Sequence, residues 1–331
     1  MPPSSPTRIP RDRRAVRTLV VAVVVAVIAA AAILAATRAG HRGGSASGSR
    51  HPSGGPATAL ATRPSAGPHS QQTATTQSPA DSRSPASPAP APASAAVRAV
   101  STSTGAAMGL SITPVGSTGR PWTAGTLDAG AAWSTIKVPL VMASLSAGTA
   151  TLGDADVRAA IISSDNASAE RLTRRLGTDA AAASAVKAQL VARGDTTTVP
   201  ARVRTRPDFS VLGQTSWRLD DQAAFLATAA CRPHDAGLLK LMGQIEQDQR
   251  WGLGALPGAR FKGGWGPDTS GHYLVRQVGL VTVSGRSYAV AMAARAPDGS
   301  FTAGTAALGQ LATRLPALVR ALPAGAAKGR C

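Results

Sequence analysis

A serine and a lysine three positions apart, Ser134 and Lys137, have the spacing of a nucleophile and its base. If a helix begins at Ser134, the two side chains lie on one face, one turn apart. The first amides of such a helix favour a developing negative charge, and a buried lysine can lose its proton at neutral pH and act as a base. Alone, this pattern more often marks an N-cap serine followed by a surface lysine.

A second polar group, Ser164-Asp165-Asn166, interrupts two segments with helical periodicity. On a short turn beside a cleft, these residues offer a hydroxyl and an amide to a substrate. The alternative is an ordinary turn in which Asp165 or Asn166 caps the following helix.

A third group, Lys262-Gly263-Gly264, comes directly before a predicted pair of strands. A lysine followed by two glycines on an edge strand allows the backbone of a substrate to approach closely. The alternative is a glycine-rich strand end without a ligand.

The three motifs, in this order, resemble the signature of the serine β-lactamase and penicillin-binding protein family, class A β-lactamases included. The likeness covers about residues 99–322. It implies an α+β fold in which an antiparallel sheet, built from both chain ends, packs against a helical middle segment. It also implies acyl transfer from a β-lactam or a cell-wall-type peptide.

The resemblance assigns four residues to catalysis. Ser134 would attack the substrate carbonyl, and Lys137 would accept its proton. Ser164 and Lys262 would pass a proton to the leaving nitrogen.

The resemblance assigns four further residues to substrate binding. Asn166 would hold the substrate amide, and Gly264 would leave room for the substrate. The backbone N–H groups of Ser134 and Trp265 would form an oxyanion hole. Arg276 would attract the substrate carboxylate, as an arginine does in class A β-lactamases; an exposed arginine on a strand is the alternative.

Two departures from the family pattern concern turnover and affinity. Class A enzymes carry a Glu-x-x-Leu-Asn loop whose glutamate activates the deacylating water, and no such motif occurs between Asn166 and Lys262. Asp195 and Asp208, in the segment 195–217, are candidates by position only. Gly263 replaces the usual Thr or Ser, which removes a hydrogen bond worth about 1–3 kcal/mol to the substrate carboxylate.

Hydrophobic periodicity, taken independently of the motifs, predicts strands at both ends of the region 99–331 and helices between them. Ser284-Gly285 is typical of a tight hairpin turn. The predicted strands are 106–114, 121–125, 273–283 and 286–295, and the clearest helices are 219–230 and 302–322. This order gives an α+β domain with a sheet assembled from both chain ends.

The first 98 residues have a different composition. A basic segment, 1–17, precedes an uncharged apolar stretch, 18–37, which is long enough for a transmembrane anchor or a signal segment. Residues 38–98 are rich in Pro, Ser, Ala and Thr, which predicts a disordered linker. The expected organisation is a cytoplasmic tail, a single-pass membrane helix, a linker and an extracytoplasmic domain at 99–331, secreted if the apolar segment is cleaved.

The net charge of +18 suits an anionic envelope, and scattered arginines with few aromatic residues argue against nucleic-acid binding. Cys231 and Cys331 can either pair in an oxidising compartment or remain free. No metal-type cysteine spacing occurs. We expect no cofactor, no metal ion and a monomer.

These observations predict an extracytoplasmic, β-lactamase-like serine hydrolase of β-lactamase or D,D-peptidase type, which forms an acyl-enzyme with β-lactams or cell-wall-type peptides. The missing glutamate motif and Gly263 leave an alternative open. In that alternative, the chain is a non-hydrolytic relative that binds penicillin, a cell-wall peptide or a protein partner.

Overall fold

A six-stranded sheet forms the centre of the computed structural model, which describes residues 87–117, 119–322 and 331. The strand order is β1-β3-β2-β6-β5-β4, and all neighbours are antiparallel except β1 and β3. The strands are β1 (Ser87–Pro88), β2 (Ala107–Pro114), β3 (Trp122–Gly125), β4 (Arg260–Pro267), β5 (Tyr273–Val283) and β6 (Arg286–Arg295). An early strand, β2, therefore pairs with the last strand, β6, as the α+β prediction requires.

The hairpin between β5 and β6 is confirmed. Val283 pairs with Arg286, and the two turn residues between them, Ser284 and Gly285, both have positive φ. Two successive residues of this kind form the turn whose twist matches that of the flanking strands. The hairpin places β5 between β6 and β4, and β4 is an edge strand of the sheet.

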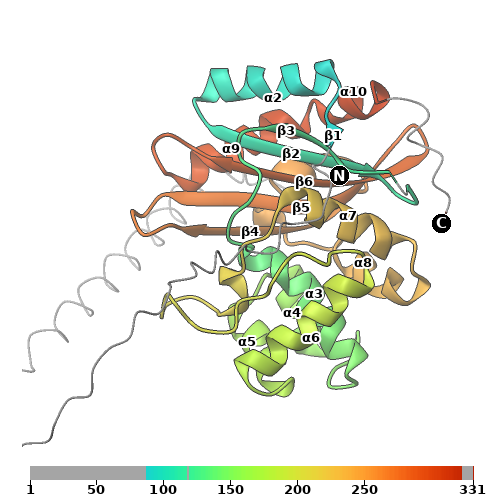
Figure 1. The fold of residues 1–331 in the computed structure, drawn as a ribbon, viewed down its shortest axis with the longest axis vertical. Coiled ribbons are helices and arrows are strands. Elements are labelled where there is room, and N and C mark those ends of the chain that lie inside the picture. Colours follow the sequence, from blue (N-terminus) through green and yellow to red (C-terminus); the bar gives the residue numbers. More distant parts are fainter. Residues whose placement is uncertain (1–86, 118, 323–330) are drawn as a thin grey trace, which may run out of the picture. The chain divides into compact units, whose positions relative to one another are not determined.

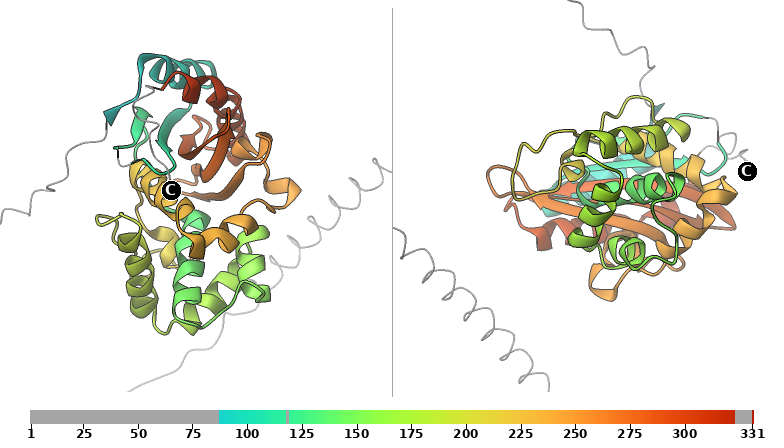
Figure 2. Two further views of the ribbon diagram at one scale, coloured as in Figure 1. Left: turned by 90° about the vertical axis from the view of Figure 1, so that its right-hand side faces the viewer. Right: turned by 90° about the horizontal axis from the view of Figure 1, so that it is seen from below.

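Helices cover both faces of the sheet (Figures 1 and 2). Helices α2 (Ala91–Thr104), α9 (Phe301–Ala312) and α10 (Leu315–Arg320) pack on one face, and α7 (Leu219–Ala230) packs on the other. The remaining helices form the predicted helical middle below α7: α3 (Lys137–Ser146), α4 (Ala155–Ile162), α5 (Asn166–Arg175), α6 (Asp179–Ala192) and α8 (Ala236–Leu241). Single 3₁₀ turns connect them: η1 (Trp133–Ile136), η2 (Leu212–Gln214), η3 (Pro233–Asp235), η4 (Gln247–Gln249) and η5 (Gly252–Ala255).

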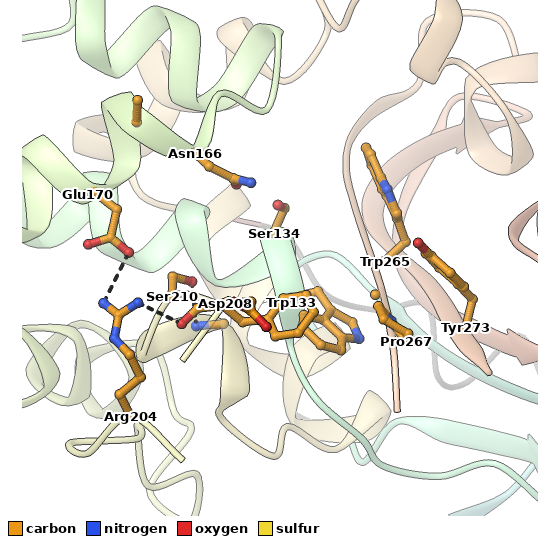
Figure 3. Close-up of a pocket in the computed structure, with 14 residues that line it drawn as sticks. Trp133, Ser134, Asn166, Glu170, Arg204, Asp208, Ser210, Trp265, Pro267 and Tyr273 are labelled. Carbon is orange, nitrogen blue, oxygen red and sulfur yellow. Dashed lines mark hydrogen bonds and ion pairs between the residues drawn. The ribbon is translucent and has the colours of Figure 1, made fainter. Parts of the chain in front are cut away.

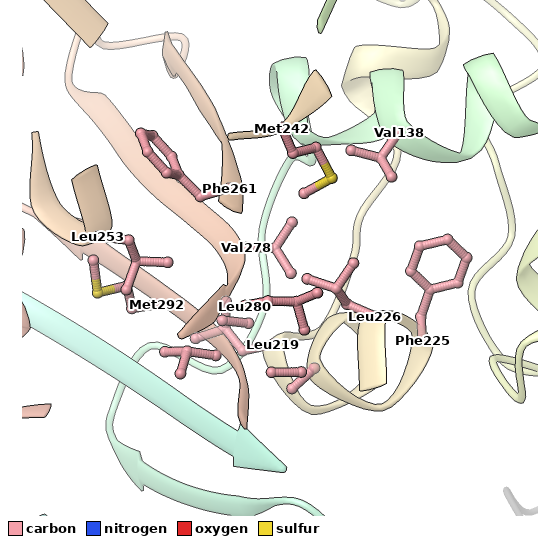
Figure 4. Close-up of a cluster of buried hydrophobic side chains, with 14 of the residues drawn as sticks. Val138, Leu219, Phe225, Leu226, Met242, Leu253, Phe261, Val278, Leu280 and Met292 are labelled. Atoms are coloured by element: carbon pink, nitrogen blue, oxygen red, sulfur yellow. The ribbon is translucent and has the colours of Figure 1, made fainter. Parts of the chain in front are cut away.

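Apolar side chains join the sheet to the helical middle (Figure 4). Val278 and Leu280 of β5 are buried together with Leu226 of α7 and Met242, which follows α8. Phe261 of β4 is fully buried in the same core. Because Phe261 is fixed in this core, the next residues of β4 are held at the boundary between sheet and helices.

The predicted linker, 38–98, is wrong at its C-terminal end. Residues 87–98 form β1 and the first half of α2, and Val97 is buried against the sheet. Small residues form this interface, with Ala93, Val97 and Val100 at helical spacing. A search for large apolar side chains therefore misses it. The predicted segments 1–17 and 18–37, and the linker up to residue 86, lie outside the described residues.

The predicted final helix, 302–322, is two helices, because Pro316 lacks a backbone N–H and can only stand in the first turn of a new helix. In the part of the chain that the structure describes, no helix is both long and apolar enough to cross a membrane. Cys231 and Cys331 form a disulfide, which selects one of the two alternatives for these cysteines.

Replacement of Val97 by Asp should lower the free energy of unfolding by about 3 kcal/mol, because it places an unpaired carboxylate under α2. Arg98→Ala, at the exposed neighbouring position, is the matched control and should change stability by less than about 0.5 kcal/mol. Urea unfolding curves of both variants would measure this. Equal stability of the two variants would mean that the residues before 99 are not part of the folded domain.

Candidate active site

Ser134 lies in η1, one turn before Lys137 opens α3, as the Ser-x-x-Lys spacing predicts. Ser134 lines a pocket of about 570 Å³. The residue before it, Trp133, has φ 47°, an unusual value for a bulky residue. Its indole packs against the ring of Phe209 at 5.1 Å and fills the space next to Gly266, where a Cβ would lie 2.7 Å from it.

The Lys137 side chain is 4% exposed and points into the turn that carries the second motif. Its Nζ donates hydrogen bonds to the backbone carbonyl of Ser164 at 2.5 Å and to Oδ1 of Asn166 at 2.7 Å. Burial lowers the pKa of Lys137 to about 8, against the opposing effect of the Asp165 and Glu170 charges. An appreciable fraction of Lys137 is therefore neutral near physiological pH.

The Ser164-Asp165-Asn166 turn combines the two arrangements that its sequence predicts, a helix cap and a cluster of polar side chains. Asp165 caps α5 by accepting a hydrogen bond from the backbone N–H of Ser168 at 2.6 Å, as the capping alternative predicts. The same turn gives Ser164 a positive φ of 57° and makes Asn166 the first residue of α5. Ser164 and Asn166 are thereby held next to Lys137.

Charged groups beside the turn fix the angle between the two helices that it connects. Asp156 of α4 accepts hydrogen bonds from Arg171 at 2.6 Å and from Arg175 at 2.5 Å, both on α5. Hydrogen bonding to Arg171 lowers the pKa of the Asp156 carboxyl, which stays ionised. These contacts keep the unusual Ser164 conformation in place.

Lys262 reaches the same turn from the edge strand β4. The side chain is fully buried, and its Nζ donates to Oγ of Ser164 at 2.7 Å and to the carbonyl of Gly263 at 3.0 Å. Burial, and next the charge of Lys137, lower the pKa of Lys262 well below its usual value. The Ser164 hydroxyl therefore links Lys262 to the turn whose Asn166 lines the pocket.

Gly264 brings β4 against the residues that carry the candidate nucleophile Ser134. These residues, 130–136, are called the nucleophile segment below. A Cβ at this position would lie 2.8 Å from the carbonyl oxygen of Ala132 and 3.0 Å from the backbone nitrogen of Ser134, so no side chain fits. The next residue, Trp265, lines the pocket. Because β4 is an edge strand, alternate backbone groups of it have no strand partner and can face a ligand.

The predicted contact of Arg276 with a substrate carboxylate is wrong. Arg276 is fully buried beneath the nucleophile segment, and its guanidinium donates to the carbonyls of Gly130, Ala131 and Trp217 and to Gln222 Oε1, at 2.7–3.1 Å. Burial lowers its pKa to about 9, so that it remains charged at pH 7. Arg276 instead supports the backbone that leads to Ser134.

The segment 195–217 places its two candidate carboxylates differently. Asp195 is fully buried and accepts hydrogen bonds from Trp217 Nε1 at 2.8 Å and from the backbone N–H of Thr198 at 2.9 Å, so it does not reach a water beside Ser134. Asp208 is exposed and lines the pocket. The positional prediction is therefore wrong for Asp195, and Asp208 remains a candidate.

Sequence reasoning missed Glu170, which also lines the pocket. It lies one helical turn after Asn166 on α5, and an Arg204 nitrogen lies 3.7 Å from its carboxylate (Figure 3). The spacing of four residues from Asn166 is the signal that would have found it, because such residues share a helix face. Glu170 and Arg204 lie at one end of the pocket, on the far side of Ser134 from Trp265 and Tyr273, and Asp208 also lines the pocket.

Aromatic side chains form the remaining wall of the pocket, with Trp133, Phe209, Trp265 and Tyr273 among the lining residues. Arg206 joins this wall to β4. Its guanidinium lies 4.3 Å from the centre of the Phe209 ring and donates to the carbonyls of Pro267 and Asp268. Within the described ranges, no group of three or more His, Cys, Asp or Glu residues is placed to hold a metal ion.

The fold has solved counterparts. A β-lactamase from Burkholderia vietnamiensis matches with a TM-score of 0.56 and 20% identity, over 70% of this chain and 98% of that one. A mutant of the class A β-lactamase of the last common ancestor of Gram-negative bacteria gives 0.55 and 19%, over 69% and 99%. PBP-A gives 0.54 and 19%, over 72% and 99%.

No family model matches the sequence, and no curated protein matches it. At these identities the similarity establishes the fold, which is that of the serine β-lactamases and PBP-A. The fold expected from the three motifs is thereby confirmed.

Arg276→Ala should lower the free energy of unfolding by about 3 kcal/mol, because it leaves several buried acceptors without their charged donor. Arg295→Ala, at the exposed end of the neighbouring strand, should have little effect. Chemical denaturation of both variants would measure the difference. A stable Arg276→Ala variant would show that this guanidinium does not support the nucleophile segment.

Proposed function

We propose that this domain is a serine hydrolase or acyltransferase that forms an acyl-enzyme at Ser134 with β-lactams or cell-wall-type peptides. The observation that carries the proposal is the Ser164 turn, which receives Lys137 at the Ser164 carbonyl and at Asn166, and Lys262 at the Ser164 hydroxyl. Three segments that are far apart in the chain thus supply a hydroxyl, two amines and an amide to one site beside Ser134.

In the proposed reaction, Oγ of Ser134 attacks the substrate carbonyl carbon, and neutral Lys137 takes the hydroxyl proton. The developing oxyanion is stabilised by the backbone N–H groups of Ser134 and Trp265. Collapse of the intermediate breaks the bond from carbon to the leaving nitrogen. Ser164 donates its proton to that nitrogen, and the proton held on Lys137 returns to Ser164 through Lys262, so that both amines end neutral.

The acyl part of the substrate lies along α5 in this proposal. Asn166 binds its amide, and the pocket continues from there past Glu170 to the segment that carries Arg204 and Asp208. This direction follows from the position of Ser164 and Lys262, which must face the leaving group in order to protonate it.

Release of the acyl group is slow in this proposal. Deacylation requires a base that can activate water beside the acylated Ser134. Asp195 is committed to the core, and the Glu170 carboxylate lies 3.7 Å from an Arg204 nitrogen, which competes with a water for its oxygens. This arrangement favours a penicillin-binding or slowly hydrolysing protein over a fast β-lactamase.

We further propose that the domain acts outside the cytoplasmic membrane, anchored by residues 18–37. The apolar segment with its preceding arginines supports an outward orientation. The disulfide between Cys231 and Cys331 is a second argument, because such bonds persist in oxidising compartments.

A fluorescent penicillin should label the purified protein covalently, and Ser134→Ala should abolish the labelling. Ser210→Ala is the matched control, because Ser210 lines the same pocket without a proposed covalent role. Gel fluorescence and mass spectrometry of the labelled peptide would locate the adduct, and its decay would report turnover. A folded, unlabelled wild-type protein would refute acylation, and measurable peptide binding by it would support the non-enzymatic alternative.

The acylation rate should rise with pH and level off above pH 8, since neutral Lys137 is the base and its pKa is about 8. At pH 7 about one tenth of Lys137 is neutral, so the rate there should be about a tenth of the plateau. Glu170→Gln should move the midpoint to lower pH, because the Glu170 charge raises this pKa. Stopped-flow acylation between pH 6 and 9 would measure both midpoints, and a flat profile would contradict the role of Lys137.

A further inference from the structure

The leaving-group side of Ser134 differs in chemistry from the acyl side. It is marked by Ser164 Oγ, with Lys262 behind it, since these groups face the departing nitrogen in the proposed function, on which this inference rests. The charged residues Glu170 and Arg204 line the pocket on the far side of Ser134 from Trp265, which is the acyl side in the proposed function.

The side-chain position next to Lys262 is empty and is bordered by an indole. A Cβ on Gly263 would lie 3.1 Å from Cζ2 of Trp251, 3.4 Å from its Cη2 and 3.6 Å from Cζ3 of Trp265. The first distance is tighter than an ordinary van der Waals contact, so a hydroxyl-bearing side chain fits only if Trp251 moves. Trp251 and Trp265 pack edge to face, with ring centres 6.1 Å apart.

Trp251 is held in place by further rings rather than by its polar atom. It lies 6.0 Å from Phe301 of α9, which also contacts Trp265 at 5.4 Å. Its Nε1 is buried, with no hydrogen-bond partner among the described residues. Trp251, Trp265 and Phe301 thus form one packed aromatic cluster, of which Trp265 lines the pocket.

Three nearby cations, Arg276, Arg250 and Lys262, are already bonded to protein groups. Arg276 is enclosed beneath the nucleophile segment by four acceptors. Arg250 lies over the buried ring of Phe261, 5.7 Å from its centre, and donates to the carbonyl of Gly254. Lys262 is fully buried and bonded to Ser164 and Gly263.

A carboxylate on the leaving group would thus contact aromatic carbon atoms. Position 263 carries no hydroxyl to bind it, and the three cations named above are already bonded to protein groups. Removing an ionised carboxylate from water without such partners is unfavourable, and the negative face of an aromatic ring does not compensate for it. An ester or a primary amide in the same place carries no such penalty and packs on the rings.

We infer that the site is built for carbonyl substrates whose leaving group is uncharged, an ester or amide packed against Trp251 and Trp265, rather than for leaving groups that carry a free carboxylate. Gly263 and Trp251 are then the residues that determine this specificity.

The test compares benzylpenicillin with its methyl ester, which differ only in the charge on the leaving-group side. Second-order acylation constants are measured on the full-length chain by intact-protein mass spectrometry. About 0.5 M NaCl screens the general attraction of a basic protein for the anionic probe. The ester should acylate Ser134 faster than the free acid, whereas a hydroxyl anchor would favour the acid by about tenfold or more.

Three variants isolate the anchor. Trp251→Phe makes room without removing a hydrogen bond and serves as the parent. Adding Gly263→Thr should raise the acid-to-ester ratio at least about tenfold over this parent. Adding Gly263→Val, with the same branched shape but no hydroxyl, should leave the ratio of the parent unchanged.

The outcomes separate the two proposals. If neither probe acylates Ser134, the proposed function fails. If both acylate it and wild-type protein prefers the acid, acylation stands and the inference about the leaving group is overturned. An equal ratio in the Thr and Val variants would likewise overturn the assignment of Gly263 as the missing anchor.

Discussion

The hydrogen bond from Lys262 Nζ to Ser164 Oγ is the contact on which the site depends, because it joins the edge strand of the sheet to the helical middle. Both lysines of the site are almost completely removed from water, and two such amines cannot both carry a charge without a large cost in free energy. Their pKa values are lowered accordingly. Protons can therefore move between the amines, Ser164 and a ligand near neutral pH, which acyl transfer requires.

This arrangement needs a rigid surrounding, because two residues of the site have unfavourable backbone conformations. Trp133 and Ser164 both have positive φ, and such strain persists only where the neighbouring structure determines the conformation. Around Trp133, the buried Arg276 binds the preceding carbonyls, and Gln222 extends this support by donating to Thr135 Oγ1 at 2.9 Å. Around Ser164, the Asp165 cap serves the same purpose.

Local rules were sufficient for the hairpin, the helix cap at Asp165 and the order of the three motifs, because each depends on residues close in sequence. The side chain of Arg276 was not predictable in this way. Arg276 pairs with Gly264 across the sheet, and its orientation depends on a strand register that a single sequence does not give. Glu170 was not predicted, because the family's loop motif is expected within residues 195–217, whereas Glu170 lies earlier, on α5. The first turns of α2 were missed because alanine-rich packing resembles a linker in composition.

Several polar groups of the segment 195–217 hold the segment itself in place. Arg206 binds the carbonyls that end β4, and Gln214 binds the backbone of Arg206 and Phe209. Asp195, at the start of the segment, accepts a hydrogen bond from the indole N–H of Trp217, at the end of the segment. A wall fixed in this way shapes the acyl side of the pocket and keeps Trp133 under Gly266. Under the proposed function, the groups suited to forming an acyl-enzyme are therefore concentrated in the three motifs, whereas those suited to hydrolysing it are sparse, so that the two half-reactions would depend on different parts of the fold.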